Sequence, residues 1–498
     1  MSTVDSLVPP GVRVRLSDDV VRCDDGQTLF GTRSGRILRL APVAVRILQD
    51  GDFTVSDRTG AVLSRALFDR GMADPLWPAR PAETDPARAL HDVTVVVPVR
   101  DRTSALQALL EALPPVGDVV VVDDGSRDPE AVRAACERAR ARVVRHQVSH
   151  GPAAARNTGI SCCTTDFVAV IDSDVIPEEH ALARLRRHFD DPLVGVAGPR
   201  IMGAQVCGTG WIARYEAASS SLDLGPVAGP VAPLTRLSYL PSATLMLRVA
   251  ALGSGFDPDL HVAEDVDLVW RMVASGWRAR YAPEARVHHD HRTTTGAWVA
   301  RKSFYGTGAA LLAQRHGALV APMRLHPLSA AVVAFAATQR RRTVTAAAAL
   351  AGVQLLLTAQ RVRTQHRHHP VRLGATLTAM SLTAAAMQTG AALTRHHWPV
   401  ALLLATRSRR ARRMLVLAAL TCGARGHRES ELDPVRYLLA RRADDLAYGF
   451  GLWRGALAAR SPRCLLPSFT SLCATRTAPP SPVGDAPLTP TREGTRHG

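Results

Sequence analysis

Four short runs of β-branched residues, whose starts lie about 24 residues apart, constrain the fold of this chain more than any other feature. They are VTVVVPV (93–99), DVVVVDD (118–124), ARVVRH (141–146) and DFVAVID (166–172). A parallel strand returns to its neighbour only through a crossover of a dozen or more residues, usually a helix. Runs that are apolar on both faces suit a sheet covered by helices. The sequence therefore predicts an α/β domain built on a parallel sheet.

A smaller unit precedes this domain and occupies residues 1–80. It contains two segments that alternate polar and apolar residues, as half-buried strands do, and two segments with helical spacing. The predicted strands are 12–16 and 36–40, and the predicted helices are 44–48 and 59–70. A proline-rich linker follows, which we place at residues 81–90. We expect an α+β domain of the winged-helix-like kind.

The positive charge of the chain is concentrated in one segment. The formal net charge is +17, yet residues 291–428 contain 20 Arg and Lys and no Asp or Glu, so the remainder sums to about −3. An acid-free, Arg-rich surface adheres to anionic lipid. We find no recognition helix and no aromatic–basic platform of the kind that reads nucleic acid. An anionic membrane surface is therefore the expected partner, and nucleic acid is not.

The composition becomes rich in Ala, Leu, Thr and Arg over residues 301–474, which predicts a basic helical region. Two stretches there lack charge, 343–360 and 373–394. A membrane-spanning helix needs about 20 mostly apolar residues. Arginines flank both stretches on every side, so they indicate no orientation. Spanning segments and an Ala-rich bundle resting on the enzyme domain are the two alternatives. We expect residues 475–498 to be a disordered tail.

Cysteine usage and the N-terminus bear on the location of the protein. The eight cysteines show no C-x-x-C spacing, which indicates a reducing environment. The first residues lack a basic start followed by an apolar run, so they indicate no signal peptide. With the basic segment, these features predict the cytoplasmic side of the cell membrane.

Three of the predicted strands end in acidic or other polar residues. They are Pro98 and Arg100 at the first strand, Asp123 and Asp124 at the second, and Asp172 and Asp174 at the fourth. In an open α/β sheet, ligands bind outside the carboxyl ends of the strands. If only one strand ended in this way, the acids would be explained as caps of the next helix. Because three α/β units carry polar residues at their strand ends, the sequence favours a shared polar site.

Asp172 and Asp174 follow a buried strand, so their carboxylates would be held at a fixed sheet edge. Two hard oxygen ligands in this position suit Mg²⁺ or Mn²⁺ shared with a diphosphate. The segment VHHDHR (287–292) supplies histidines, and either His289 or His291 would complete a metal site begun by Asp174. Spacing alone does not choose between them.

Two further segments carry candidate residues. In HGPAAARNTGI (150–160), Arg156 and Asn157 are placed to reach phosphate or ribose. In AEDVDLVWRMVASGW (263–277), Glu264 and Asp265 open a predicted helix, where acids commonly just complement the dipole. As a functional residue, Asp265 is a candidate general base. The dipole is expected to keep its pKa low and its carboxylate ionised at neutral pH.

The motifs PVRDR, VVDDGS, HGPAAARNTG, FVAVIDSD, SGFDPDLHVAEDVDLVWR and VHHDHR occur in this order over about 200 residues. Together they resemble the family 2 inverting glycosyltransferases of the GT-A fold, which places that nucleotide-sugar-binding domain at residues 91–300. The resemblance implies the following roles: Asp123 and Asp124 near uracil and ribose, Pro98 and Arg100 beside the base, Asp174 with Asp172 on the divalent cation, His289 near it, and Asp265 as the base.

Residues 1–80 resemble the small peptide-binding domains of the pyrroloquinoline quinone biosynthesis chaperone type, in PGVRVRLSDD and LFGTRSGRILRLAPVAVRIL. Such domains bind leader peptides of ribosomally made, modified peptides, often as an added strand. The fusion of the two domains with a basic helical C-terminus resembles the glycosyltransferase family of the mycofactocin system.

That resemblance implies transfer of glucose from UDP-glucose to a peptide-derived redox cofactor precursor, premycofactocin, building a β-linked oligoglucoside with a divalent metal as cofactor. It also implies a precursor peptide as a partner of residues 1–80. The alternative is a membrane-bound family 2 glycosyltransferase that acts on a lipid or a cell-wall polysaccharide. A peptide-binding scaffold without activity is disfavoured, because it would have no reason to keep Asp124, Asp174 and Asp265 together.

Overall fold

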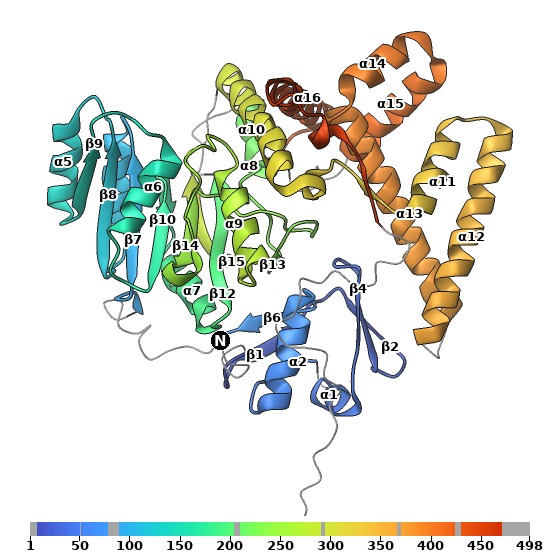
Figure 1. Cartoon of the computed structure of the whole chain (residues 1–498), viewed down its shortest axis with the longest axis horizontal. Helices are drawn as coiled ribbons and strands as arrows, with labels where there is room; N and C mark the ends of the chain where they lie inside the picture. The colour runs from blue at the N-terminus through green and yellow to red at the C-terminus, as the bar shows by residue number, and fades with distance from the viewer. Residues whose placement is uncertain are drawn as a thin grey trace, which may run out of the picture.

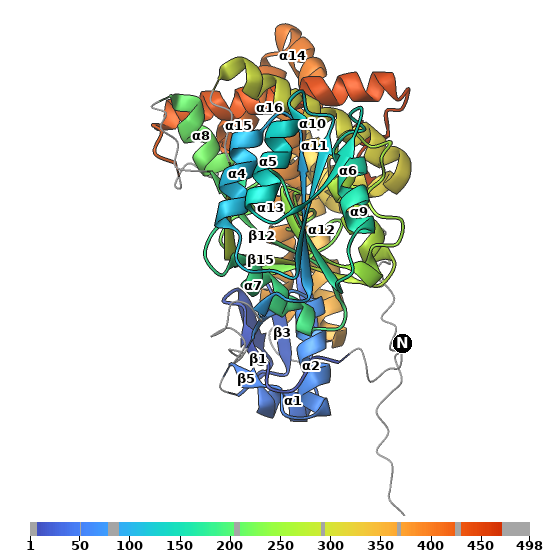
Figure 2. The ribbon, with the colours of Figure 1, turned by 90° about the vertical axis from the view of Figure 1, so that its left-hand side faces the viewer.

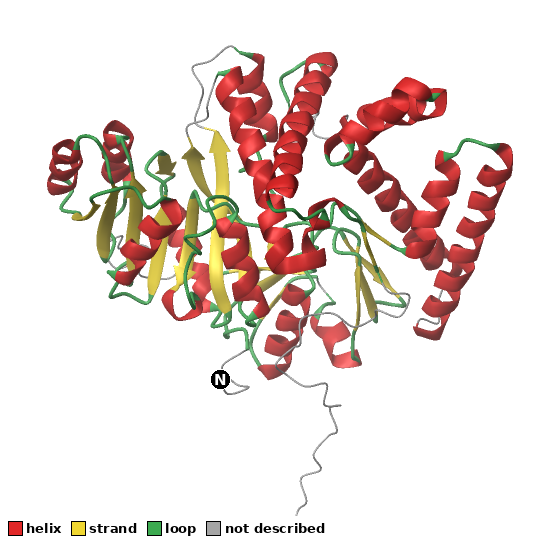
Figure 3. Cartoon of the chain, turned by 45° about the horizontal axis from the view of Figure 1, so that its top comes forward, coloured by secondary structure: helices red, strands yellow, loops and turns green. Residues whose placement is uncertain are grey.

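The computed structural model describes residues 7–49, 51–77, 89–203, 210–289, 294–365, 370–423 and 430–470. Figure 1 shows an N-terminal unit below a central sheet and an array of helices beside and above them. Figure 3, coloured by secondary structure, shows the strands of the central domain in yellow and the mostly helical region that follows it in red. The predicted tail at 475–498 and residues 81–88 of the predicted linker lie outside the described residues.

A nine-stranded sheet forms the centre of the molecule, with the order β11-β15-β12-β14-β10-β7-β8-β9 and β13 paired to β15. The four predicted strands are β7 (Val93–Val99), β8 (Asp118–Asp124), β9 (Arg142–His146) and β10 (Phe167–Ile171). They pair in parallel. The crossover helices are α4 (Thr103–Ala112), α5 (Pro129–Arg138) and α6 (Pro152–Ser161). The predicted α/β domain is confirmed.

The other half of the sheet is mixed. Its strands are β11 (Val175–Pro177), β12 (Val194–Gly203), β13 (Gly229–Val231), β14 (Thr244–Arg248) and β15 (Arg278–His289). β14 runs antiparallel to both β10 and β12, so β12 and β15 run in the same direction as the four predicted strands. The carboxyl ends of these six strands therefore lie at one edge of the sheet.

The core fills both faces of the sheet. Along β7, Val95 and Val97 face a cluster with Leu106 of α4, whereas Val96 faces a second cluster with Ala155 of α6. The alternation follows from the two-residue repeat of a strand. The remaining helices of the domain are α7 (Ala181–Arg187), α8 (Trp211–Ser219) and α9 (Glu264–Ala274). Removing a fully buried valine from water stabilises the fold by about 1.5–3 kcal/mol, which explains the apolar runs.

The N-terminal unit consists of two helices and two small sheets, as the sequence predicts for an α+β domain. Its elements are β1 (Arg13–Leu16), β2 (Val20–Cys23), β3 (Thr28–Gly31), β4 (Arg36–Arg39), α1 (Pro42–Ile47), β5 (Phe53–Thr54), α2 (Arg58–Asp69) and β6 (Ala73–Leu76). The sheets have the orders β5-β1-β6 and β2-β3-β4.

Figure 2 shows this unit below the central sheet. Ion pairs dock it on the central domain at the amino ends of the parallel strands. Both guanidinium nitrogens of Arg65 lie 2.7 Å from the carboxylate of Asp191, just before β12. At the start of β15, Arg278 pairs with Asp69, and Arg280 donates to Asp74 at 2.7 Å. The N-terminal unit therefore lies at the sheet edge opposite the strand ends that carry the candidate site.

The C-terminal helices are α10 (Thr295–His316), α11 (Pro327–Ala337), α12 (Arg341–Gln365), α13 (Pro370–Arg395), α14 (Trp398–Arg407), α15 (Arg409–Gly423) and α16 (Pro434–Ala458), with a small parallel pair, β16 (Arg324–Leu325) and β17 (Ser468–Phe469). The predicted domain boundary at residue 300 falls inside α10. Helices α10 and α16 touch backbone to backbone. A Cβ added to Gly451 would lie 1.7 Å from the carbonyl oxygen of Ser303, and one added to Gly306 would lie 2.1 Å from that of Tyr448. α16 therefore belongs to the wall of the central domain.

Within the described residues, one helix is long and apolar enough to cross a membrane: residues 341–363 in α12, whose most apolar stretch of 18 residues has a mean hydropathy of 1.4. It contains the predicted segment 343–360. The second predicted segment, 373–394, does not meet the same criterion. Its Thr, Ser, Gln and Gly content makes it less apolar, and its helix α13 packs against α12 at Gly374, where an added Cβ would lie 2.8 Å from the Cα of Ala359.

Candidate active site

Asp124, at the end of β8, organises one end of the site. Its carboxylate accepts hydrogen bonds from Ser149 Oγ at 2.6 Å, His150 N at 2.8 Å and Gly151 N at 2.9 Å, and it lies 2.8 Å from His146 Nδ1. Burial by itself would raise the pKa of Asp124, but these hydrogen bonds hold the pKa below its ordinary value. An ionised Asp124 therefore fixes the loop that leads into α6.

Asp123 and Arg100 complete this end. Asp123 accepts from Ser126 N at 2.9 Å and forms an ion pair with Arg145, so its carboxylate holds the turn after β8. Arg100 reaches the same loop and donates to Ser149 Oγ at 3.1 Å. Pro98 lies two residues earlier on β7, opposite Val122. The structure thus gathers Pro98, Arg100, Asp123 and Asp124 at one edge of the sheet, as predicted.

Arg156 on α6 is a buried connector between two chain segments. Its side chain is 3% exposed, donates from Nη2 to Asp172 at 2.7 Å and from Nη1 to Glu264 at 2.9 Å, and stacks over the ring of Phe256 at 5.4 Å. Burial alone would lower the pKa of Arg156, but Asp172 and Glu264 hold the pKa above its ordinary value. The guanidinium therefore ties the end of β10 to the start of α9.

These contacts change the interpretation of the segment 150–160. Both Nη nitrogens of Arg156 donate to protein carboxylates and do not point into open space. The amide of Asn157 is also engaged, because its Nδ2 donates to the carbonyl of Phe256 at 2.6 Å and its Oδ1 accepts from Phe256 N at 2.9 Å. The expectation that both side chains reach phosphate or ribose does not agree with this geometry. They brace the site instead.

Asp265, the predicted base, follows Ala263, a residue in the left-handed region with φ of 64°. Its carboxylate accepts from Ser242 N at 2.9 Å and from its neighbour Val266 N at 2.8 Å. Burial, together with the charge of Glu264, raises the pKa of Asp265 to about 6 against the lowering effect of these hydrogen bonds and of Arg156. The expectation of a low pKa was wrong, because desolvation and the charge of Glu264 outweigh the hydrogen bonds and the positive charge that lower it.

Asp174 and His289 lie side by side because of strand register. β11 pairs antiparallel with β15 so that Val175 is opposite His289. This places His289 Nε2 3.6 Å from Asp174 Oδ2, with both side chains mostly buried. Arg102 forms an ion pair with the same carboxylate oxygen. Asp172 points to Arg156 instead, and His291 lies outside the described residues.

The donor atoms of Asp174 and His289 fit a divalent metal. A carboxylate oxygen and an imidazole nitrogen are ligands of Mn²⁺, and Mg²⁺ is commonly held by one or two carboxylates together with substrate phosphates. The part of the chain that the structure describes gathers no cluster of three His, Cys, Asp or Glu side chains. The predicted set of Asp172, Asp174 and His289 is thus reduced to the pair Asp174 and His289.

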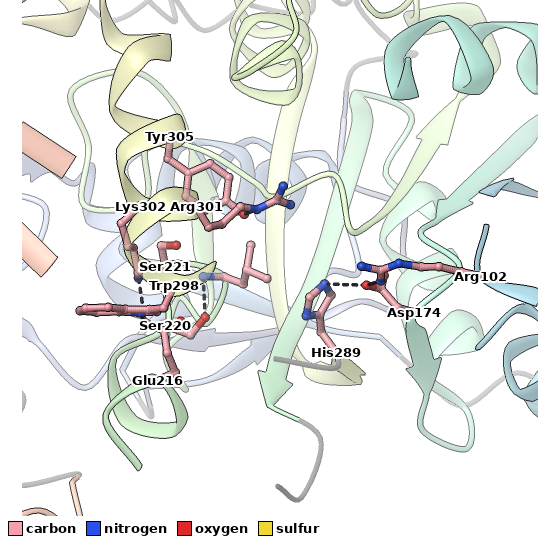
Figure 4. Close-up of a pocket in the computed structure, with 11 residues that line it drawn as sticks. Arg102, Asp174, Glu216, Ser220, Ser221, His289, Trp298, Arg301, Lys302 and Tyr305 are labelled. Carbon is pink, nitrogen blue, oxygen red and sulfur yellow. Dashed lines mark hydrogen bonds and ion pairs between the residues drawn. The ribbon is translucent and has the colours of Figure 1, made fainter. Parts of the chain in front are cut away.

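A pocket extends from this pair to a wall that the sequence did not predict. Figure 4 shows Arg102, Asp174 and His289 on one side and residues of α8 and α10 on the other. The wall residues are Glu216, Ser220, Ser221, Leu222, Trp298, Arg301, Lys302 and Tyr305. Tyr305 lies near Asp265: burial raises the pKa of this tyrosine, and the charge of Asp265 adds to the rise. The pocket therefore extends from the Asp174–His289 pair toward the side on which Tyr305 and Asp265 lie, although Asp265 itself is not among the residues that line it.

Glu216 and Lys302 form a buried ion pair within this wall. Lys302 Nζ lies 2.9 Å from Glu216 Oε1 and 3.6 Å from Asp444 Oδ2 of α16, and Trp298 Nε1 donates to Glu216 at 2.8 Å. These residues come from three helices far apart in the sequence. No spacing pattern connects them, although Lys302 is the single lysine of the chain.

Comparison with known proteins identifies the class. Residues 94–251 match the family model "Glycosyl transferase family 2". The chain is 41% identical over 480 residues to the pre-mycofactocin glycosyltransferase of Mycobacterium tuberculosis, covering 93% of this chain and 98% of the relative. It is 29% identical over 248 residues to the succinoglycan biosynthesis protein ExoU of Rhizobium meliloti, covering 46% of this chain and 71% of the relative.

The α/β sheet, the acidic strand ends and the family match define a family 2 glycosyltransferase with a GT-A fold. Within this class, the chain belongs to the family of the pre-mycofactocin glycosyltransferases. Among solved structures, a mannosyltransferase of Pyrobaculum calidifontis in complex with GDP-Man and Mn²⁺ is 20% identical, covers 63% of this chain and 90% of its own, and has a TM-score of 0.36. A likeness at this level carries no conclusion about the donor or metal of this chain.

The raised pKa of Asp265 predicts the pH dependence of sugar transfer. A base acts in its deprotonated form, so kcat/KM should be nearly constant above pH 7 and should fall about tenfold per unit below pH 6. Asp265→Asn should lower the rate by a factor of about 10²–10⁴ and spare nucleotide binding.

Asp259→Asn, an equal change at an exposed position close to α9, is the matched control and should keep the wild-type rate. Initial rates across pH 5–8 and calorimetric titration of UDP measure both effects. Transfer by Asp265→Asn at the control's rate would remove Asp265 as the base.

Proposed function

We propose that this glycosyltransferase transfers glucose from UDP-glucose to premycofactocin, a peptide-derived redox cofactor precursor, and extends the product into a β-linked oligoglucoside. The observation that carries the proposal is the pocket beside the Asp174–His289 pair, with Asp124 and its loop at the same sheet edge. The family assignment supplies the acceptor. The donor sugar and the product follow from the sequence resemblance and are part of the proposal.

The proposed reaction is a single displacement with inversion. Asp265 accepts the proton of the acceptor hydroxyl, and the resulting oxygen nucleophile forms a bond to the anomeric carbon while the bond from that carbon to the diphosphate oxygen breaks. Asp174 and His289 would hold a divalent ion, which would neutralise the charge of the departing UDP. Asp123, Asp124 and the loop before α6 would position the uracil and ribose.

The raised pKa suits Asp265 to this role. An aspartate with a pKa near 6 is mostly ionised at neutral pH, and it is a stronger base than an ordinary aspartate. Burial also keeps water away from the reacting atoms. The hydrogen bonds from Ser242 N and Val266 N occupy one lone pair on each oxygen and leave others to accept the proton.

For the N-terminal unit we propose a precursor peptide as partner. β2 is an edge strand of its sheet, and a groove between the β2–β3 hairpin and α1 is lined by Leu29, Val45 and Leu48. An extended peptide adds to such an edge through its backbone and places alternate side chains in the groove. Because this unit docks at the far edge of the sheet, it would hold a peptide away from the pocket.

For the cellular location we propose the cytoplasmic face of the cell membrane. Helices α14 and α15 carry large exposed apolar side chains: Val400, Leu402, Leu403, Leu404, Val416, Leu417 and Leu420. Arginines 407, 409, 410, 412 and 413 lie on the same two helices, in a segment without Asp or Glu. Apolar residues beside arginines and without acids suit the interface of an anionic bilayer.

The proposed activity is tested by incubating the purified protein with premycofactocin, MnCl₂ and one of UDP-glucose, UDP-galactose or GDP-mannose, followed by mass spectrometry. We expect a ladder of added hexoses with UDP-glucose alone and no product from Asp174→Asn, because its carboxylate is lost. Transfer to a membrane lipid or polysaccharide, with premycofactocin left unmodified, would instead support the alternative function.

The proposed membrane contact is tested by vesicle flotation. Wild-type protein should float with vesicles containing phosphatidylserine and not with neutral phosphatidylcholine vesicles, and binding should weaken as salt is raised. Replacing arginines 409, 410, 412 and 413 by Gln should reduce binding, since each is worth about 1 kcal/mol near the surface. Arg133→Gln on exposed α5 is the control. Equal flotation with neutral and anionic vesicles would contradict the electrostatic account.

A further inference from the structure

Arg102 occupies the position beside Asp174 where a metal ion is proposed to bind. Its Nη1 pairs with Asp174 Oδ2, the same oxygen that lies 3.6 Å from His289 Nε2. Asp174 and His289 are 13% and 15% exposed, whereas Arg102 is 45% exposed. The two proposed metal ligands are therefore held by their surroundings, and the arginine is the member of the group that is able to move.

The backbone directs Arg102 to this position. Asp101, the residue before it, has a φ of 56°, in the left-handed region that non-glycine residues rarely adopt. Ser126 Oγ accepts from Asp101 N at 3.0 Å, and Asp101 Oδ1 accepts from Arg127 N at 2.8 Å. This strained turn sends Arg100 to the Ser149 end of the site and Arg102 to the Asp174 end.

A cation at Asp174 and the guanidinium of Arg102 exclude each other. Both are positive, and both require the same carboxylate oxygen, so one leaves when the other binds. A guanidinium displaced from Asp174 remains in the pocket, which Arg102 lines together with Arg301 (Figure 4). Its donors match the oxygens of a diphosphate, the group that a nucleotide sugar would bring to this place.

We propose that Arg102 is a resident counter-ion of Asp174 that changes partner when the donor binds, from the carboxylate to the diphosphate. The exchange couples two binding events. A divalent cation alone must displace Arg102 without replacing its ion pair, so it binds weakly. A nucleoside diphosphate gives the guanidinium a new partner, so it strengthens cation binding. The inference rests on the metal site of the proposed function.

The test measures binding of Mn²⁺ by electron paramagnetic resonance, without and with UDP. In the wild type, UDP should tighten Mn²⁺ binding by about tenfold or more, within the usual range of coupling between sites. Arg102→Gln should bind Mn²⁺ alone about tenfold more tightly than the wild type, and UDP should then tighten Mn²⁺ binding by a smaller factor than in the wild type, because only direct ligation of the ion by the diphosphate remains. Arg133→Gln removes an equal charge at an exposed site and should behave as the wild type.

Asp174→Asn separates failure of this inference from failure of the metal site. If Asp174→Asn loses Mn²⁺ binding while Arg102→Gln shows wild-type affinity for Mn²⁺ alone, the metal site stands and the exchange is wrong. Full UDP coupling in Arg102→Gln would likewise reject the exchange. If Asp174→Asn binds Mn²⁺ as the wild type does, the metal site itself is wrong and the inference falls with it.

Discussion

The candidate site depends on one buried guanidinium. Arg156 joins Asp172, at the end of β10, to Glu264, at the start of α9, and so brings two segments separated by about 90 residues into one site. Without that positive charge, the mostly buried carboxylate of Glu264 would lose its ion-pair partner, and breaking a buried pair in this way typically costs about 3–5 kcal/mol. The same charge moderates the rise in the pKa of Asp265. Arg156 thus has a structural role: its ion pairs hold the end of β10 and the start of α9 together.

The C-terminal helices complete the site. Glycines on α10 and α16 allow the two backbones to touch, and a Cβ added to Gly308 would lie 3.1 Å from the Cβ of Ala263, in the turn before Asp265. Lys302 then joins α10 to Glu216 of α8 and Asp444 of α16. The part of the pocket wall that α10 supplies, together with α16 packed behind it, therefore comes from chain segments outside the matched family region at 94–251, whereas Glu216 of α8 lies within that region.

Local sequence patterns predicted the parts of the structure that local physics determines. Apolar runs at crossover spacing gave the parallel strands, and acids at their ends gave Asp124 and Asp174 at one edge of the sheet. The partner of a buried charge is a tertiary property, so Arg156 looked like a phosphate ligand, and Asp265, the predicted base, was expected to keep a low pKa. The wall of Glu216 and Lys302 joins residues 86 positions apart, which leaves no periodic signal. Segment 373–394 lacks charge, but its Thr, Ser, Gln and Gly content makes it less apolar than the helix at 341–363, and it packs against that helix at Gly374.

The central claim is that acids from separate segments converge around one divalent ion and one nucleotide sugar. The most direct measurement is a crystal structure of the protein with UDP and MnCl₂, in which anomalous scattering locates the metal. The account predicts a Mn²⁺ peak between Asp174 and His289, uracil beside the Asp124 loop, and Asp265 facing the pocket. A nucleotide bound away from this edge of the sheet, or a metal that does not contact Asp174, would contradict it.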